Sequence, residues 1–413
     1  MSSRARGIVV SVVWLFVLQF FDYMGWFAAV NGKIIDPILR VHSSGPESPA
    51  SQHIYVIEID DEAYESCFHH QSPMDPRRVF NLVKEIAEAN PKAIAVDIHT
   101  EEPQYSDWIH ELAGYASSIV WVSDYATIKQ HVAPFPAWLT GARDDNIVTP
   151  RPVLGMAPFT LPRSRQTNWG IALYARDEDG RIRRFPRTVS VAANDIQGHG
   201  SAPSWAARVG DVYCGDECTA ESADEIYISY AGTEPTRYKM LDLFGCPNGP
   251  GDSHRLELLP NWNALRGQLL GKLVLVGATF RGSSYPTPKR DLPGLIVNAY
   301  AVKAELDGNG LEEVRQPLAW MLDLALGLLI VFICDEKSMQ RLDQFRALSF
   351  VSGWKRKKIV LSTAVVIAVC VASLFVAKGR YLLGFGGEGA GVLVDRLRDL
   401  WDFTEPKPSR RRP

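Results

Sequence analysis

The sequence predicts a single α/β domain with a mainly parallel sheet, held outside the cytoplasm and flanked by transmembrane α-helices. Three observations lead to this prediction: long apolar runs near both ends of the chain, basic clusters beside them, and alternating strand and helix patterns in between. The chain has 413 residues and a formal net charge of −3. It therefore has no overall positive field to hold a polyanion, and nucleic-acid binding is not expected.

The first apolar run covers residues 7–30 and is interrupted only by Gln19 and Asp22. A helix of this length can cross a hydrocarbon core of about 30 Å. We expect a signal anchor, so that residues 1–30 form a cytoplasmic tip and an N-terminal transmembrane helix. A cleaved signal peptide is the alternative, although the apolar region of such a peptide normally has only about 7–15 residues.

Two further apolar runs, residues 317–334 and 359–377, are each predicted to cross the bilayer. The loop between them, residues 335–358, ends in four consecutive basic residues, and the N-terminus carries two arginines. Basic flanks tend to stay in the cytoplasm, so both segments are expected there. Residues 31–316 then lie on the far side of the membrane as the exported domain.

Residues 378–413 are expected to hold a marginal fourth membrane segment and a short basic tail. Residues 381–394 are few for a span, rich in glycine and interrupted by Glu388, whereas the arginines at 410–412 favour a cytoplasmic end. A crossing is the preferred interpretation. A re-entrant or interfacial segment is the alternative, and it would leave the tail outside.

The exported domain begins with a predicted βαβ unit. Residues 53–60 alternate apolar and polar side chains as a strand does, and residues 76–90 carry apolar side chains at helical spacing. Residues 93–98 form a more continuous apolar run, which is typical of a parallel strand covered by helices on both faces. Further along the pattern predicts a tight hairpin at 177–184, strands at 118–123, 225–230 and 272–276, and helices near 203–209 and at 295–306.

Six short segments of this region occur in an order typical of one family. They are IEIDDE at 57–62, DPR at 75–77, KAIAVD at 92–97 followed by Glu102, Pro103 and Asp107, the D-x-D-G-x-x-R element within 177–184, GKLVLVGAT at 271–279, and Thr287-Pro288 with Pro293-Gly294. In this order, after one predicted span and before a C-terminal membrane cluster, they resemble the type-two CHASE domain. That domain is the extracellular sensory module of bacterial cyclases and histidine kinases.

The resemblance implies a multi-pass protein of the bacterial inner (plasma) membrane, with its main domain periplasmic or extracellular. It implies a receptor-like sensor that binds a signal outside the cytoplasm and passes it through its transmembrane helices. Family members usually continue into an output domain, whereas here only about twenty residues follow the last apolar segment. We therefore expect a stand-alone form that acts on a separate cytoplasmic effector. The family often has an aspartate shortly before the Thr-Pro pair, where this chain has Ser283, Ser284 and Tyr285, so no ligand contact is carried over there.

Acidic residues follow the first two predicted strands. Asp60, Asp61 and Glu62 come after the first strand, and Asp97 ends the second. If these strands are neighbours, the four carboxylates share the edge at which open α/β sheets bind ligands, and Arg77 begins the helix beside them. These five residues are the candidate ligand-binding set, for a cation or a polar molecule. The structural alternatives are turn capping, loop ordering, and an ion pair of Arg77 with Asp60 or Asp97.

Four of the six cysteines, Cys67, Cys214, Cys218 and Cys246, lie in the predicted exported domain. An even number there is compatible with two disulfides, for which three pairings exist. Zinc binding by the C-x-x-x-C pair with two nearby histidines is an alternative, but the ligand spacing is only half present, so no metal site is predicted. Free thiols are the third interpretation.

Neither catalytic residues nor a cofactor are predicted. The sequence has no G-x-S-x-G elbow and no H-E-x-x-H, and GQLLGK at 267–272 lacks the glycine spacing of a phosphate loop. The expected partners are the membrane, an unknown extracellular ligand and a separate cytoplasmic effector, with a homodimer as the common default. The rival hypothesis is a non-signalling membrane anchor or assembly protein that uses the same domain for protein–protein contact.

Overall fold

The computed structural model of the chain forms two compact units, one of residues 1–38 with 313–413 and one of residues 39–312. The structure describes ten ranges of residues, and short stretches within some of these ranges are left out. These ranges are 35–40, 53–128, 147–150, 168–192, 199–215, 225–246, 255–280, 284–307, 312–313 and 381–382.

The three predicted spans, at residues 7–30, 317–334 and 359–377, lie outside the described residues. Within the described part of the chain, no helix combines the length and the apolar character that crossing a membrane requires. The transmembrane helices therefore stay predictions.

The larger unit is built on a six-stranded sheet in the order β12-β1-β15-β2-β3-β6. Every neighbouring pair is parallel. The prediction of an α/β domain with a mainly parallel sheet is confirmed. The strands are β1 (Ile54–Ile59), β2 (Ala93–Asp97), β3 (Ile119–Ser123), β6 (Asn168–Ile171), β12 (Thr236–Lys239) and β15 (Leu273–Ala278).

β1 and β2 form where the sequence predicts them, but they are not neighbours. β15 lies between them, so that Glu58, Gly277 and Asp97 are aligned across three adjacent strands. The assumption that the first two strands are adjacent is wrong. The reason is that a strand from much later in the chain, whose first five residues are fully buried, takes the central place in the sheet.

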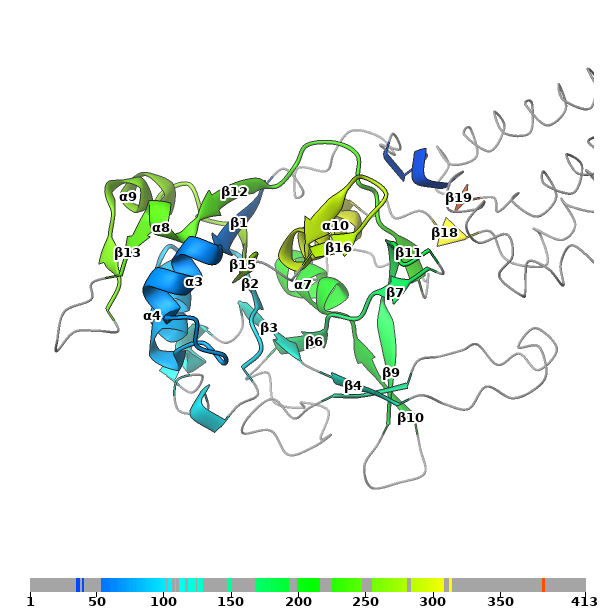
Figure 1. Cartoon of the computed structure of the whole chain (residues 1–413), viewed down its shortest axis with the longest axis horizontal. Helices are drawn as coiled ribbons and strands as arrows, with labels where there is room; N and C mark the ends of the chain where they lie inside the picture. Colours follow the sequence, from blue (N-terminus) through cyan, green and yellow to red (C-terminus); the bar gives the residue numbers. More distant parts are fainter. Residues whose placement is uncertain are drawn as a thin grey trace, which may run out of the picture. The chain divides into compact units, whose positions relative to one another are not determined.

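Helices cover both faces of the sheet (Figure 1). On one face lie α3 (Asp61–Phe68), α4 (Pro76–Glu88), α8 (Met240–Leu243) and α9 (Pro260–Arg266), and on the other lie α7 (Trp205–Cys214) and α10 (Gly294–Asp307). Ile94 and Val96 of β2 pack in the first layer, and the intervening Ala93 and Ala95 pack in the second. This alternation follows from the period of two along a strand.

The predicted first helix corresponds to α4, and local sequence signals explain its start. Asp75 caps it by accepting a hydrogen bond from the backbone N–H of Arg77 at 2.9 Å, and Pro76 occupies the first turn. Its apolar stripe, which includes Val79, Leu82, Val83 and Ile86, is buried against the sheet.

Smaller antiparallel sheets surround the central one. β7 (Ala175–Arg176), β8 (Ile182–Pro186) and β11 (Glu225–Tyr227) form a three-stranded sheet, and β16 (Ser284–Pro286) pairs with β17 (Asp291–Pro293). The hairpin predicted at 177–184 is thus present, and Gly180 supplies its positive φ of 78°. The other elements are β4 (Tyr125–Ile128), β5 (Ile147–Pro150), β9 (Thr188–Ala192), β10 (His199–Pro203), β13 (Phe244–Gly245), β14 (Glu257–Leu258), β18 (Glu312–Glu313), β19 (Tyr381–Leu382), η2 (Pro103–Tyr105) and η3 (Ala113–Tyr115).

A disulfide joins Cys67 in α3 to Cys246 just after β13, with their Cα atoms 5.4 Å apart. Cys214 at the end of α7 is also disulfide-bonded, and Cys218 lies outside the described residues. The zinc and free-thiol interpretations therefore do not apply to Cys67, Cys214 and Cys246, because none of them carries a thiolate.

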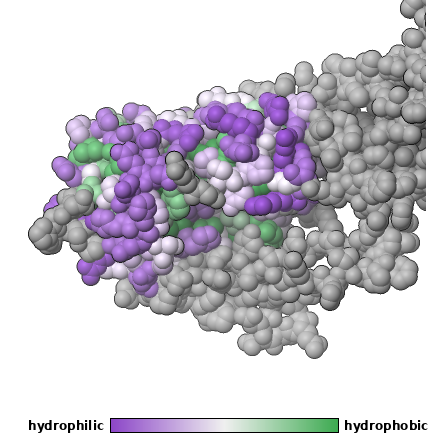
Figure 2. Space-filling view, viewed as in Figure 1, coloured by the Kyte–Doolittle hydropathy of each residue, from purple (hydrophilic) through white to green (hydrophobic). Residues whose placement is uncertain are grey.

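The described surface is mainly hydrophilic on the side shown in Figure 2, with small separate hydrophobic areas. Leu258 and Leu270 are the large hydrophobic side chains that are exposed among the described residues. Scattered apolar residues of this kind do not form an interaction surface.

Replacing both Cys67 and Cys246 by Ser is expected to lower the Tm of the full-length protein in detergent by roughly 5–15 °C. The two cysteines are 179 residues apart in sequence, and closing a long loop stabilises a fold by about 2–4 kcal/mol, which gives a Tm shift of this order. Tryptophan fluorescence during heating measures the change. A reducing agent is unsuitable, because it would also cleave the disulfide of Cys214. An unchanged Tm in the double variant would contradict the prediction.

Candidate functional site

A cavity of about 380 Å³ lies at the carboxyl ends of three strands of the central sheet. From the sheet come Asp97 at the end of β2, Val122 and Ser123 at the end of β3, and Ala172 just after β6. Open α/β sheets bind ligands at this edge, and the volume is within the range of small-molecule sites.

The remaining walls come from elements far apart in the sequence. The helix α10 contributes its first two turns, the β7–β8 hairpin contributes a second wall, and the strand β16 contributes an aromatic ring. These residues are Gly294, Val297 and Asn298 from α10, Tyr174, Arg176 and Ile182 before and within the β7–β8 hairpin, Tyr285 from β16, and His99 after β2.

A chain of two hydrogen bonds fixes the orientation of Asp97. The Tyr174 hydroxyl donates to Oδ1 of Asn298, and Nδ2 of Asn298 donates to Oδ2 of Asp97 at 2.8 Å. Asn298 is only 3% exposed in an otherwise apolar stretch of α10. A buried amide needs partners for both its donor and its acceptor, and here it has one of each. Asp97 is thereby attached to the start of α10.

Burial raises the pKa of the Asp97 carboxyl, although the hydrogen bond from Asn298 and the charge of His99 act in the opposite direction. Within the described ranges no lysine or arginine pairs with Asp97. Its charged form is therefore poorly compensated, and a positive charge or a strong hydrogen-bond donor from a ligand would stabilise it.

Gly277 of β15 makes room for Asp97. A Cβ atom built at this glycine would lie 2.8 Å from Cβ and 2.9 Å from the backbone oxygen of Asp97. Real Cβ atoms do not approach backbone so closely, because the repulsion is steep at this distance. The glycine is therefore needed for the position that Asp97 adopts.

Glu58, on the other side of Gly277, differs from Asp97 because its negative charge is compensated by an arginine. It is only 6% exposed, and Arg237 of β12 binds both its carboxylate oxygens, with Nη2 at 2.8 Å from Oε2. The hydroxyl of Thr279 donates to the same Oε2 at 3.2 Å. A bidentate arginine and a hydroxyl satisfy this buried carboxylate, so Glu58 has a structural role.

The acids that follow β1 lie at the start of α3 and do not line the cavity. Oδ1 of Asp60 accepts a hydrogen bond from the N–H of Ala63 at 3.0 Å, and Oδ2 pairs with Nζ of Lys239 at 2.9 Å. Asp61 and Glu62 are exposed in the first turn of α3, where negative charge suits the helix dipole. Asp60 thus caps α3, while Asp61 and Glu62 lie on its exposed first turn.

Arg77 is exposed, and its guanidinium lies 5.0 Å from the centroid of the Trp108 ring. The ion pair with Asp60 or Asp97 that the sequence left open does not form, because Asp60 pairs with Lys239 and Asp97 is bonded to Asn298. Of the five candidate ligand-binding residues, the structure places Asp97 in the cavity. β15 separates it from the group after β1.

Sequence reasoning missed Tyr174, Arg176, Tyr285 and Asn298. Asn298 left a usable signal, since it is an amide within the apolar run LIVNAYAV. Tyr285 lies where this chain differs from the family pattern, so no ligand contact was expected there. Arg176 carries no local signal, because only the hairpin fold brings it to the cavity.

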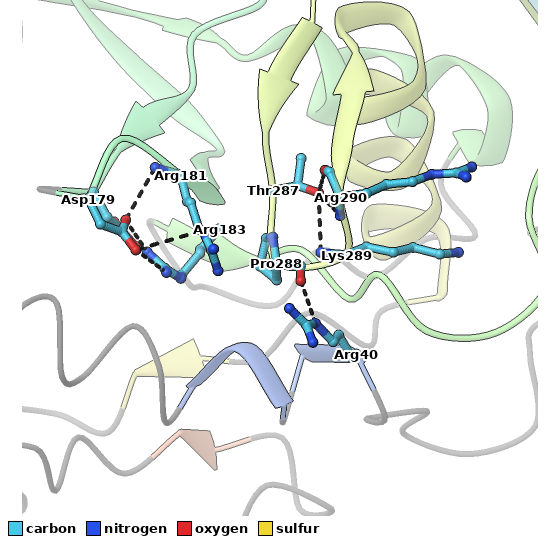
Figure 3. A network of polar contacts seen from close by, with 9 residues as sticks. Arg40, Asp179, Arg181, Arg183, Thr287, Pro288, Lys289 and Arg290 are labelled. Atoms are coloured by element: carbon cyan, nitrogen blue, oxygen red, sulfur yellow. Dashed lines mark hydrogen bonds and ion pairs between the residues drawn. The ribbon is translucent and has the colours of Figure 1, made fainter.

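A second polar cluster orders the β7–β8 hairpin beside the cavity (Figure 3). The fully buried guanidinium of Arg183 makes two hydrogen bonds to Asp179, at 2.6 and 2.8 Å, and one to Asp177 at 2.7 Å. These contacts lower the pKa of Asp179, chiefly through the hydrogen bonds from Arg183. Two carboxylates thus compensate one buried arginine and hold the turn closed.

The β16–β17 turn is ordered by the side chain of Thr287, which donates to the Arg290 carbonyl at 2.5 Å and accepts from the N–H of Lys289 at 3.3 Å. Nε of Arg40 donates to the Pro288 carbonyl of this turn (Figure 3). The segment that contains Arg40 is thus bonded to the hairpin that carries Tyr285.

These features define an α/β domain with an open parallel sheet and a polar cavity at its carboxyl edge. The family model of the CHASE2 domain matches residues 9–334. The chain therefore belongs to the CHASE2 family, a family of extracytoplasmic sensory domains, and the resemblance seen in the sequence is confirmed. Comparisons with curated proteins and with solved structures found no match.

Changing Gly277 to Ala is expected to lower the free energy of unfolding by about 1–3 kcal/mol, because the new methyl group collides with the backbone of Asp97. The matched control is Gly267→Ala at the end of α9. There a Cβ atom has no neighbour within 4 Å, and φ is −67°. Thermal unfolding of the full-length protein measures both variants. Equal effects at the two glycines would show that the close approach to Asp97 is unimportant.

Changing Asp179 to Asn is expected to cost about 1.5–3 kcal/mol at pH 7, the range for hydrogen bonds to charged groups. The cost should shrink below about pH 4. The pKa of this carboxyl is lower in the folded than in the unfolded protein, so its stabilisation is complete above the unfolded value of about 3.9 and is lost as the pH falls through the folded value. Tm values of both proteins between pH 7 and pH 3 measure this.

The control for that comparison is Asp291→Asn on β17, an exposed aspartate whose side chain makes no described contact. Its Tm should stay close to that of the unchanged protein throughout. A cost of Asp179→Asn that does not vary with pH would mean that the Asp179 charge does not stabilise the hairpin.

Proposed function

We propose that the protein is a multi-pass sensor of the bacterial inner membrane, whose exported domain binds a small polar molecule in the cavity at the sheet edge. Its transmembrane helices then pass the signal to a separate effector in the cytoplasm. In this proposal the domain binds its ligand and does not transform it. The observation that carries the proposal is the double role of α10, which forms one wall of the cavity and precedes the predicted span at 317–334.

Polar contacts hold α10 at its cavity end and at its later turns. Beyond its bond to Asp97 through Asn298, the helix is held by Lys303, whose Nζ donates to the Thr233 carbonyl at 2.9 Å, and by Glu305, which pairs with Arg187 at 2.5 Å. A ligand that binds Asp97 alters the contact at the first of these points. A signal requires two arrangements of such an element, with the ligand favouring one of them.

The β16–β17 hairpin offers a second connection. It leads directly into α10, its Tyr285 lines the cavity, and its turn accepts the hydrogen bond from Arg40. The segments by which the chain enters and leaves the exported domain are therefore both linked to one cavity wall. A sensor that signals through helices before and after its domain requires such a link.

Purifying the full-length protein in mild detergent and identifying bound proteins by mass spectrometry tests the proposal. We expect a partner with a catalytic cytoplasmic domain, and we expect its loss when the four basic residues at 355–358 are changed to Ser. Changing the arginines at 410–412 to Ser is the matched control, since it removes a comparable positive charge outside the loop. Protease digestion of spheroplasts should show that the exported domain keeps its orientation in both variants.

Retention of the partner in the 355–358 variant would overturn the proposed route through this loop. Recovery of the protein alone, or of exported partners only, would support the anchor or assembly hypothesis instead.

A further inference from the structure

Two opposite charges line the cavity without pairing. Asp97 lies at the sheet side, and its described partner is the neutral amide of Asn298. Arg176 lies on the hairpin side, with its guanidinium 5.3 Å from the centroid of the Tyr285 ring. Within the described ranges Arg176 makes neither an ion pair nor a hydrogen bond through its side chain. Asp97 and Arg176 therefore give the cavity an anionic and a cationic binding group.

Several other carboxylates of the described domain have a basic side chain close by. Beside the sheet and its hairpins, these acids form ion pairs. Examples are Glu58 with Arg237, Asp60 with Lys239, Asp179 with Arg183, Glu234 with Lys289 and Glu305 with Arg187. Against this background, an acid and a base that share a cavity and stay apart indicate a site built for a third, complementary group.

We propose that the cavity binds a free amino acid, with its ammonium group at Asp97 and its carboxylate at Arg176. The inference rests on the proposed function and names the class of its ligand. An ammonium group has three donors and matches a carboxylate that has one oxygen without a described partner. The planar guanidinium of an arginine binds a carboxylate through two parallel hydrogen bonds.

Tyr285 orients the cationic end of the site. A guanidinium over an aromatic face is held by the attraction between the cation and the ring, and its N–H groups then point outward in the plane of the guanidinium. The Arg176 side chain therefore loses less conformational freedom when a ligand binds, which favours binding of a small molecule. Asn298 has the same effect at the anionic end, because it holds the Asp97 carboxylate in one orientation.

The apolar part of the wall indicates what kind of amino-acid side chain fits. Val122, Ile182 and Val297 also line the cavity, and all three are buried. An apolar side chain of the ligand would bury its surface against them, at about 25 cal/mol per Å². We therefore expect a preference for amino acids with apolar side chains over those with charged ones.

The test uses the full-length protein in detergent. Its Tm is measured with each of the twenty free L-amino acids at millimolar concentration, and those that raise it are titrated by calorimetry. We expect at least one amino acid to bind. We also expect at least tenfold weaker binding of the corresponding amine, which lacks the carboxylate, and of the corresponding acid, which lacks the ammonium group.

Asp97→Asn and Arg176→Gln should each weaken that binding at least tenfold. The matched controls are Asp291→Asn and Arg77→Gln. Arg77 also lies over an aromatic ring, that of Trp108, but it is not part of the cavity. Both controls should keep the affinity of the unchanged protein. The Tm without ligand reports whether each variant is folded.

Unchanged affinity in Asp97→Asn and Arg176→Gln would overturn the inference, as would binding of the amine or the acid as tightly as the amino acid. The absence of binding by every amino acid would overturn it as well. If the cytoplasmic partner still co-purifies in that case, the ligand class is wrong and the sensor function stands. If amino acids bind but no partner is recovered, the ligand class stands and the proposed signalling fails.

Discussion

The position of β15 in the centre of the sheet determines where the polar groups of this domain lie. Its first five residues are buried, and helices cover the sheet on both faces. In β1, β15 and β2 the charged side chains therefore lie near the carboxyl ends of the strands, where the covering layers stop. At that edge Gly277 separates Glu58 from Asp97, and its missing side chain leaves the space that Asp97 uses.

The two acids beside Gly277 show two ways of placing a carboxylate near a core. Glu58 is neutralised by the fork of Arg237, which turns a costly buried charge into a link between β1 and β12. Asp97 receives only an amide hydrogen bond, so burial dominates and its pKa is raised. A group left in this condition beside a cavity is typical of a functional site, because a ligand can supply the missing compensation.

The same edge is also where the fold can connect a ligand to the rest of the chain. α10 and the β16–β17 hairpin line the cavity, and the hairpin turn is bonded to Arg40 in the segment that enters the domain. In this domain of the CHASE2 family, these contacts link the cavity walls to segments that lie next in sequence to the predicted spans. The physical requirement is modest, because a change of one hydrogen bond on α10 can bias a packed helix that has two arrangements.

The sequence by itself determined the α/β class, the positions of β1, α4, β2, β3, β15 and α10, and the family. These depend on local periodicity, capping residues and short motifs, which are contained within neighbouring residues. It also identified Asp97 as a candidate, because an acid at the end of an apolar strand lies at the edge where open α/β sheets bind ligands. The tertiary structure alone decided that β15 separates β1 from β2, that Cys67 pairs with Cys246, and that Arg176, Tyr285 and Asn298 join Asp97 at one cavity. Those contacts join segments that are far apart in the chain. Their free energy comes from burial and pairing between segments, which the sequence of one segment does not contain.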